Sequence, residues 1–265
     1  MYEMITSFQN PKVKRLLQLQ QKSSERRAAG LFVVEGRREL MHCVENGYEI
    51  DSVFLCPSVE TGTEPMPTLP PAVKVYEVSK SIYDKLAYRG STEGVLAQVC
   101  IRSLGLNDLH LPDTPLIVVL ERVEKPGNLG AILRSADAAG VDAVIVCDPL
   151  TDLYNPNLIR ASVGASFSVP CVACTSSQCI EFLKARHIQI LTAQLQDSSL
   201  YYDTDMCRPT AIIMGTEATG LTAQWREAAD AHIRIPMLGC VDSLNVSVSA
   251  AVLIYEAVRQ RSSHR

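Results

Sequence analysis

The sequence predicts an α/β protein made of two units joined by a short polar linker. Short Val- and Ile-rich runs alternate with segments of helical periodicity along most of the chain. A stretch rich in Gly, Asn, Asp and Pro at residues 103–114 separates about a hundred residues from the remainder. The 265 residues, 47% of them hydrophobic, can bury one large core or two modest ones. We therefore expect domains at residues 1–102 and 115–265, with 103–114 as the linker.

The first unit is expected to combine four strands with three helices. A helix should begin at Pro11, whose fixed φ suits a first helical position, with Val13, Leu16 and Leu17 on its apolar side. The Pro- and Thr-rich run 57–71 is predicted as an exposed loop, because its prolines cannot join a strand ladder. The predicted helices are 10–21, 36–44 and 79–87, and the predicted strands are 31–35, 53–56, 73–78 and 95–100.

The second unit is expected to be a mostly parallel sheet with helices on both faces. Its apolar runs and helical segments alternate at a spacing typical of parallel strands joined by crossover helices. Such sheets bind ligands beyond the carboxyl ends of their strands, so the loops there are the candidate site. The predicted strands are 116–120, 141–147, 166–172, 188–193, 211–214 and 232–235, and the predicted helices are 128–139, 155–164, 177–187, 222–230 and 245–260.

Composition and missing motifs exclude several classes of function. No run approaches the roughly 18 uncharged apolar residues of a membrane span, and we expect no signal peptide. Nine scattered cysteines indicate reduced thiols and a cytoplasmic protein. Cys171 and Cys174 have no second pair at a metal-ligand spacing, so no metal is expected. Fingerprints of dinucleotide-binding, P-loop and serine-hydrolase sites are also missing from the sequence.

Basic residues gather near the N-terminus of an otherwise acidic chain. The net charge is −4, yet residues 1–40 hold eight Lys and Arg against four Glu. This asymmetry indicates contact with a polyanion. A solvated helix surface explains the same residues equally well.

The first of three polar strand–loop–helix junctions in the second unit contains Asn128 and Arg134. Asn128 can cap the following helix, and the long side chain of Arg134 can reach back toward the same end. A nucleotide phosphate would be the natural ligand there. A surface arginine on an amphipathic helix is the competing explanation.

The other two junctions lie near the C-terminal end of the sequence. Glu217 stands between Gly215 and Gly220, where glycine permits close backbone approach. Ser243 and Asn245 stand where the N-cap of the last helix belongs. A tight turn with a solvated glutamate and a capped buried helix explain the two junctions equally well when each is taken alone.

Together the three junctions resemble the three motifs of the SpoU (TrmH-like) branch of the SPOUT RNA methyltransferases. Residues 155–164 resemble the family's stretch between motifs one and two, and residues 1–100 resemble its L30e-like substrate-binding domain. One departure is Ala218, where the family usually has glycine. The matching segments are Asn128-x-Gly130-x-x-x-Arg134, Gly215-x-Glu217-x-x-Gly220-Leu221, and Ile235-Pro-Met followed by Ser243-Leu-Asn-Val-Ser-Val.

The resemblance implies 2′-O-methylation of an RNA ribose with S-adenosylmethionine as the methyl donor. It also implies a trefoil-knotted C-terminal sheet and a homodimer, whereas periodicity alone predicts an unknotted sheet. Ribosomal RNA is favoured over transfer RNA because of the separate N-terminal domain. The alternatives are a tRNA 2′-O-methyltransferase, a non-catalytic RNA-binding protein on the same scaffold, and a transferase or dehydrogenase with an unusual nucleotide site.

The resemblance also assigns roles to residues of this chain. Arg134 takes the main catalytic role, and because a guanidinium is a poor base we expect it to act electrostatically and by positioning. The other predicted catalytic residues are Asn128, Glu217, Ser243 and Asn245. The predicted cofactor-binding residues are Thr192, Ala193, Gly215, Ile235, Met237 and Leu244. The RNA-binding residues predicted from the basic N-terminal segment are Lys12, Lys14, Arg15, Arg37 and Arg38.

Overall fold

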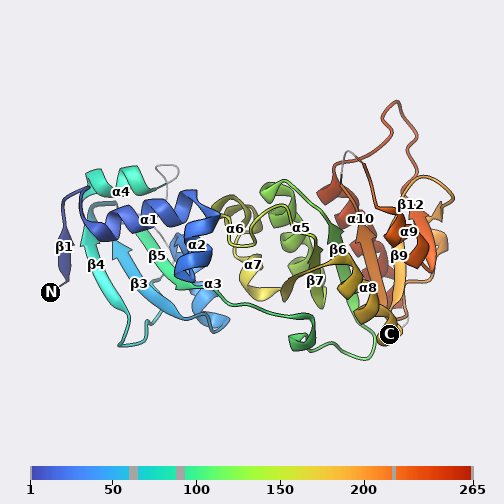
Figure 1. The fold of residues 1–265 in the computed structure, drawn as a ribbon, viewed down its shortest axis with the longest axis horizontal. Helices are drawn as coiled ribbons and strands as arrows, with labels where there is room; N and C mark the ends of the chain where they lie inside the picture. The colour runs from blue at the N-terminus through green and yellow to red at the C-terminus, as the bar shows by residue number, and fades with distance from the viewer. Residues whose placement is uncertain (1, 60–64, 88–92, 217–218, 264–265) are drawn as a thin grey trace. The chain divides into compact units, whose positions relative to one another are not determined.

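A computed structural model describes residues 2–59, 65–87, 93–216 and 219–263, which form two compact units (Figure 1). The first unit comprises Met1–Arg102 and Leu153–Ser168, and the second comprises Ser103–Asp152 and Val169–Arg265. The predicted linker 103–114 therefore belongs to the second unit. Residues 153–168, placed by the sequence in the second domain, pack within the first unit instead.

The first unit is built on a mixed five-stranded sheet. Its strands are β1 (Glu3–Ile5), β2 (Leu31–Glu35), β3 (Ile50–Leu55), β4 (Lys74–Val78) and β5 (Val95–Cys100), in the order β1-β4-β3-β5-β2. β4 pairs in parallel with β1 and β3, whereas β5 runs antiparallel to β3 and β2. The four predicted strands are present. β1 was not predicted, because three residues with only Ile5 buried give no periodic pattern.

Alternating side chains of β2 divide the core of the first unit into two layers. Leu31 and Val33 pack with the apolar sides of α1 and α4 on one face. Phe32 and Val34 pack with α3, α6 and α7 on the other. Asn10 caps α1 by accepting the Lys12 amide at 2.9 Å. The helices are α1 (Pro11–Gln21), α2 (Ser23–Ala29), α3 (Arg37–Glu45), α4 (Lys80–Leu86), α6 (Pro156–Ser162) and α7 (Ala165–Ser168).

The second unit contains a seven-stranded sheet in which every neighbouring pair is parallel. The strand order is β10-β12-β9-β11-β6-β7-β8. This confirms the predicted mostly parallel sheet. The strands are β6 (Leu116–Glu121), β7 (Ala143–Cys147), β8 (Cys171–Cys174), β9 (Gln189–Ala193), β10 (Ser199–Leu200), β11 (Thr210–Met214) and β12 (Ala231–Arg234).

The predicted strand 166–172 is wrong over most of its length, because Ala165–Ser168 forms α7 and the strand begins only at Cys171. Two consecutive residues of positive φ, Val163 and Gly164, turn the chain before α7. The hydroxyl of Ser162 then accepts the Ser166 amide at 3.3 Å. This local side-chain contact outcompetes the weak strand pattern of the segment.

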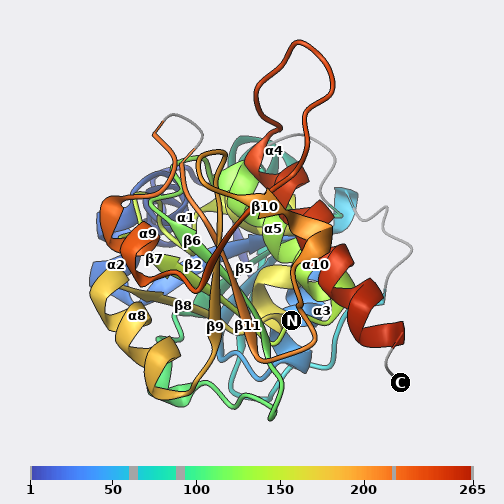
Figure 2. The ribbon, with the colours of Figure 1, turned by 90° about the vertical axis from the view of Figure 1, so that its right-hand side faces the viewer.

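Helices cover both faces of the second sheet, as Figure 2 shows with α8 and α9 on one side and α5 and α10 on the other. Trp225 of α9 and Leu183 of α8 are buried against the first face. None of the helices in the described ranges combines the length and apolar content that a bilayer crossing requires. The helices are α5 (Pro126–Ala139), α8 (Ser176–Ala185), α9 (Ala223–Ala228) and α10 (Val246–Ser263).

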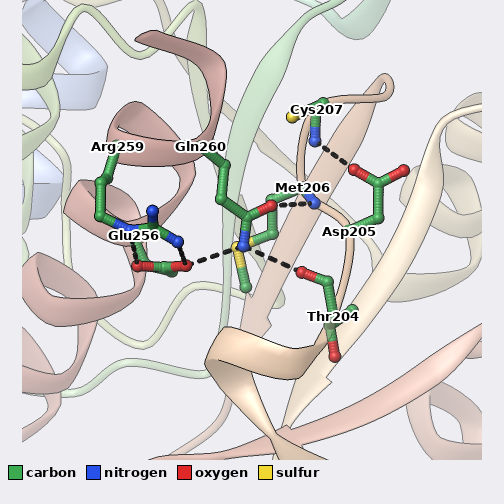
Figure 3. Close-up of polar contacts among 7 residues, drawn as sticks. All are labelled: Thr204, Asp205, Met206, Cys207, Glu256, Arg259 and Gln260. Atoms are coloured by element: carbon green, nitrogen blue, oxygen red, sulfur yellow. Dashed lines mark hydrogen bonds and ion pairs between the residues drawn. The ribbon is translucent and has the colours of Figure 1, made fainter. Parts of the chain in front are cut away.

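The C-terminal half of α10 is fixed to the loop that precedes β11 (Figure 3). Gln260 accepts the Met206 amide at 2.8 Å and donates to the Thr204 carbonyl at 3.0 Å. Arg259 donates two hydrogen bonds, of 2.8 and 2.7 Å, to the carboxylate of Glu256. These contacts hold the helix whose other end enters the candidate site.

Candidate active site

A cavity of about 700 Å³ opens at the carboxyl end of the second sheet. It lies among the loops that follow β6, β9, β11 and β12, beside the first turn of α10. The loop from β12 to α10 projects from the body of the unit in Figure 2. From β6 the chain adds β7 and β8 on one side of the sheet, and it then crosses to add β9 to β12 on the other side. The cavity lies beside the end of β6, where this direction changes, and doubly wound sheets hold their ligands at such a switch point.

Five of the six residues predicted to bind a cofactor line this cavity, namely Ala193, Gly215, Ile235, Met237 and Leu244. The sixth, Thr192, is fully buried, with its hydroxyl 2.6 Å from Nδ1 of His232 on β12. Thr192 therefore joins two strands that frame the cavity and does not face it. A polar residue that the sequence did not single out, Gln194, also lines the cavity.

The loop after β11 folds back as a tight hairpin. The amides of Thr216 and Gly220 each donate to the other's carbonyl, at 3.3 and 3.1 Å. A Cβ at position 215 would lie 2.3 Å from the carbonyl carbon of Gly220, so Gly215 is required by close backbone approach. The predicted catalytic Glu217 and the divergent Ala218 lie outside the described residues.

Glu121, at the carboxyl end of β6, anchors the far side of this hairpin. Its side chain is buried and accepts the amide and hydroxyl of Thr222 at 2.9 and 2.7 Å. Thr222 is the N-cap residue of α9. Glu121 is not among the residues predicted from the sequence, although a carboxylate that ends a fully apolar strand is a signal that could have identified it.

Asn245 and Asn128 bring the first and third motif segments together. The amide nitrogen of Asn245 donates to Oδ1 of Asn128 at 3.3 Å. Asn245 also accepts the amide and hydroxyl of Ser247, at 3.0 and 2.6 Å, as the N-cap of α10. Ser243 lines the cavity, and its hydroxyl donates to Asp242 at 3.2 Å. The predicted capping role therefore holds for Asn245 and is wrong for Ser243.

α5 begins earlier than predicted, and this changes the position of Asn128. The helix begins at Pro126 with Lys125 in the cap position, so Asn128 is its third residue and not its cap. Proline at the first helical position fixes φ there, which explains the early start. Arg134 lies six positions further along α5, where its side chain is exposed. At about 100° per residue, Arg134 points roughly 120° away from Asn128 around the helix.

The five predicted RNA-binding residues of the first unit fall into different environments. Lys14, Arg15 and Arg38 are exposed. Lys12 forms an ion pair of 2.8 Å with Glu3. Arg37 is only 7% exposed, because it begins α3 against the body of the unit. Arg37 is therefore the one member of this set that the fold buries, and its contact with RNA phosphate stays a prediction.

The first unit has a cavity of its own, of about 520 Å³. Residues of the 155–164 segment form one wall, and Arg160 donates to Glu35 at 3.4 Å. Burial raises the pKa of Glu39, another lining residue. The charged and amide side chains around it are Gln20, Gln21, Arg26, Glu35, Arg38, Glu39, Glu93, Asn155, Asn157 and Arg160.

Sequence comparison matches residues 115–255 to the SpoU rRNA Methylase family and residues 10–97 to the MRM3-like substrate binding domain. The chain is 30% identical over 256 residues to the 23S rRNA (guanosine(2553)-2′-O)-methyltransferase RlmP of Bacillus subtilis. This alignment covers 95% of the chain and 97% of its relative.

Two solved structures share the arrangement over nearly the full length. A crystal structure of an RNA 2′-O ribose methyltransferase has a TM-score of 0.83 and 37% identity, covering 98% of this chain and 99% of the other. An AdoMet-bound rRNA methyltransferase from Sinorhizobium meliloti has a TM-score of 0.87 and 28% identity, covering 97% and 98%. Their similarity thus extends across both units.

Proposed function

The chain belongs to the SpoU rRNA methylase family, and on this premise we propose that it transfers a methyl group from S-adenosylmethionine to a ribose 2′-hydroxyl of 23S rRNA. The observation that carries the proposal is the cavity at the carboxyl end of the second sheet, whose walls include Gly215, Ile235 and Asn245. Gly215 belongs to the second motif and Ile235 and Asn245 to the third, and the hydrogen bond from Asn245 to Asn128 brings the first motif beside them.

The residues around this cavity fit S-adenosylmethionine. A volume of about 700 Å³ lies within the usual range of small-molecule sites. Ile235, Met237 and Leu244 offer apolar contacts, and Gly215 exposes backbone. Oε1 of Gln194 is buried and has no hydrogen-bond partner among the described residues, so a ligand donor would satisfy it. When bound, S-adenosylmethionine would supply an activated methyl group.

The remaining task of the protein is to position and activate the ribose hydroxyl. The Asn245–Asn128 hydrogen bond would hold the start of α5 beside the cavity. Holding two reactants in the reactive geometry can contribute about 7–11 kcal/mol in the best cases. Arg134 would stabilise the negative charge that develops as the hydroxyl loses its proton, because its guanidinium stays protonated. Glu217 and Ser243 would hold the target ribose and the adjoining loops.

The position of Arg134 supports a homodimer in which each active site uses both subunits. Arg134 is absent from the described lining of its own chain's cavity, and it points away from Asn128. Val248 and Tyr255 are about half exposed on α10, at 48% and 49%, and lie seven positions apart on one side of the helix. An apolar face of this kind suits a second copy, which would bring its arginine to the cavity.

The first unit would select the RNA. Exposed Lys14, Arg15 and Arg38 can contact phosphates, and the polar cavity beside Arg38 can accept an unstacked base. We also propose that the protein acts in the cytoplasm, where a bacterial ribosomal substrate would be found.

The test is methyl transfer from labelled S-adenosylmethionine to 23S rRNA, 16S rRNA or tRNA, followed by mass-spectrometric mapping of 2′-O-methyl groups. We expect one ribose of 23S rRNA to be labelled. Labelling of tRNA alone would instead support the tRNA alternative. RNA binding without transfer to any of the three would support a non-catalytic RNA-binding protein.

A further inference from the structure

Three cysteine thiols meet at the carboxyl ends of β7 and β8 in the second unit. Cys147 ends β7, Cys174 ends β8 directly beside it in the strand register, and Cys179 lies in the first half of α8. Their sulfur atoms all lie within 4.8 Å of one another. The Sγ atoms of Cys147 and Cys174 are 4.0 Å apart.

This cluster differs from the Cys-x-x-Cys pair visible in the sequence. Cys171 and Cys174 occupy opposite ends of the four-residue strand β8, and residues three apart on a strand point to opposite faces of the sheet. The sheet register and the placement of α8 give Cys174 its neighbours. Sequence spacing therefore does not reveal the group.

One of the three thiols is accessible to solvent. Cys147 and Cys179 are buried, whereas Cys174 is partly exposed. Because Cys174 is the member that solvent reaches, it is the point at which an ion would enter the group.

We propose that Cys147, Cys174 and Cys179 form a three-thiolate site for a single soft, thiophilic cation, with monovalent copper as the ion of that class. Three sulfurs bound in a plane at about 2.3 Å from one ion lie about 4 Å apart, as the Cys147–Cys174 pair does. Thiolates select soft ions. Binding would release the thiol protons of all three cysteines into solvent, one for each sulfur-to-metal bond formed.

Zinc fits the group less well. Structural zinc sites are closed by four ligands. Across the described ranges of the chain, no histidine, carboxylate or further cysteine joins these three sulfurs within the same distance. A three-coordinate ion is therefore the better match.

The cluster adjoins the start of the motif-one loop. Cys147 is the register partner of Glu121, and its carbonyl accepts the amide of Arg122 at 2.9 Å. Arg122, with φ of +54°, begins the loop that leads to α5. An ion on Cys147 would therefore stabilise the strand ends from which the catalytic segment departs.

The direct test is copper retention by the full-length reduced protein under anaerobic conditions. Monovalent copper is added to one equivalent, and a chromophoric copper(I) chelator such as bathocuproine disulfonate then competes for it. We expect one copper ion per chain by native mass spectrometry, with a sulfur-to-copper absorption band in the ultraviolet. Cys174→Ser should weaken copper binding at least tenfold, while the matched control Cys171→Ser should leave it unchanged.

A second measurement avoids dependence on folding of the variants. Alkylation of Cys174 in the unmodified chain, located by peptide mass spectrometry, should block copper uptake. Complete transfer of copper to the chelator by the native chain would overturn the proposal. Equal retention by Cys174→Ser, or preferential retention of zinc over copper by the native chain, would overturn it as well.

Discussion

The side-chain amide of Asn245 donates a 3.3 Å hydrogen bond to Oδ1 of Asn128 and so connects the first turn of α10 with the first turn of α5. The two residues are 117 positions apart in the sequence. Asn245 has a second role as the cap of α10, whereas Asn128 is the third residue of α5 and not its N-cap. Substitution at the two positions can therefore separate catalysis from stability.

Asn128→Ala should reduce turnover while leaving the melting temperature nearly unchanged. Asn245→Ala should reduce turnover and also remove the cap, which costs about 1 kcal/mol. For a chain of this size that loss corresponds to roughly 2–4 °C. Calorimetric melting and single-turnover kinetics measure the two effects. Equal melting temperatures for both variants would contradict the capping role.

Arg134→Ala should keep the fold and S-adenosylmethionine affinity but lower turnover by about 10²–10³-fold, the usual effect of losing one charge-stabilising group. Titration calorimetry measures the cofactor affinity, and labelled methyl transfer measures turnover. Arg134→Lys is the matched variant, because it keeps the charge without the planar guanidinium, and it should recover only part of the rate. Near-normal methylation by Arg134→Ala would remove this residue from the mechanism.

Mixing two inactive variants should restore activity if Arg134 acts across a dimer. Gly215→Val removes the cofactor site, and Arg134→Ala removes the arginine. A mixed dimer then has one active site with an intact cavity from one subunit and Arg134 from the other. Restored methylation after joint refolding, with a dimer mass by light scattering, is the expected outcome. Absence of activity in a verified mixed dimer would mean that Arg134 serves its own chain.

Gly215→Ala should weaken S-adenosylmethionine binding by displacing the motif-two hairpin. The added Cβ would meet backbone atoms of Gly220 and Leu221 at 2.3 to 2.6 Å, and backbone cannot give way as a flexible side chain can. Gly127→Ala is the control, because nothing lies within 4 Å of its added Cβ. Titration calorimetry should show weaker cofactor binding for the first variant alone.

Charge reversal at Lys14 and Arg15 should weaken RNA binding and flatten its dependence on salt. Both side chains are exposed, so reversal should leave the melting temperature nearly unchanged. Each lost phosphate contact should lower the slope of log K against log salt by about 0.7–0.9. Arg37→Glu should instead lower the melting temperature, because that side chain is buried. Filter binding over a salt series measures the slopes, and unchanged slopes would exclude α1 from the RNA interface.

The contribution of Glu256 to stability should depend on pH. The hydrogen bond from Arg259, opposed by burial and aided by Gln260, lowers the pKa of Glu256 below its ordinary 4.5. A lowered pKa means that folding favours the carboxylate, so its stabilisation is present above pH 4.5 and is lost as pH falls through the folded-state pKa. Glu256→Gln should therefore melt earlier than the native chain at pH 7, with a smaller difference at pH 3. A constant difference in melting temperature would contradict this.

The sequence predicts correctly those helices and strands whose ends are set by residues within the same segment, such as a capping side chain or a proline. Asn10 and Pro11 fix the start of α1, and the Val- and Ile-rich strands of both sheets were recognised from composition alone. The short edge strands β1 and β10 were not predicted, because few of their residues are buried. The trefoil knot that the family resemblance implies would be a property of the chain path, which periodicity does not encode.

The residues of the candidate site also fall into those that the sequence predicts and those that only the fold reveals. Gly215, Asn245 and Arg134 could be identified by residue type and motif spacing, whereas the roles of Glu121 and Gln194 depend on partners that only the folded chain supplies. The burial of Arg37 also depends on the fold, since its sequence neighbours are as polar as those of exposed Arg38. Charge patterns reveal which residues are basic, but not which of them reach solvent.

The first unit is not formed by the N-terminal residues alone, because it also contains Leu153–Ser168. This segment completes the core of the first unit through Ile159 and Phe167, yet it is flanked in sequence on both sides by residues of the second unit. The chain therefore passes between the units three times, and cleavage within 103–114 would leave two covalent connections intact. An exchange of residues 1–102 between two relatives would transfer an incomplete core, because Ile159 and Phe167 would stay behind. The RNA selection that we propose for the first unit could therefore be moved to a relative only together with residues 153–168.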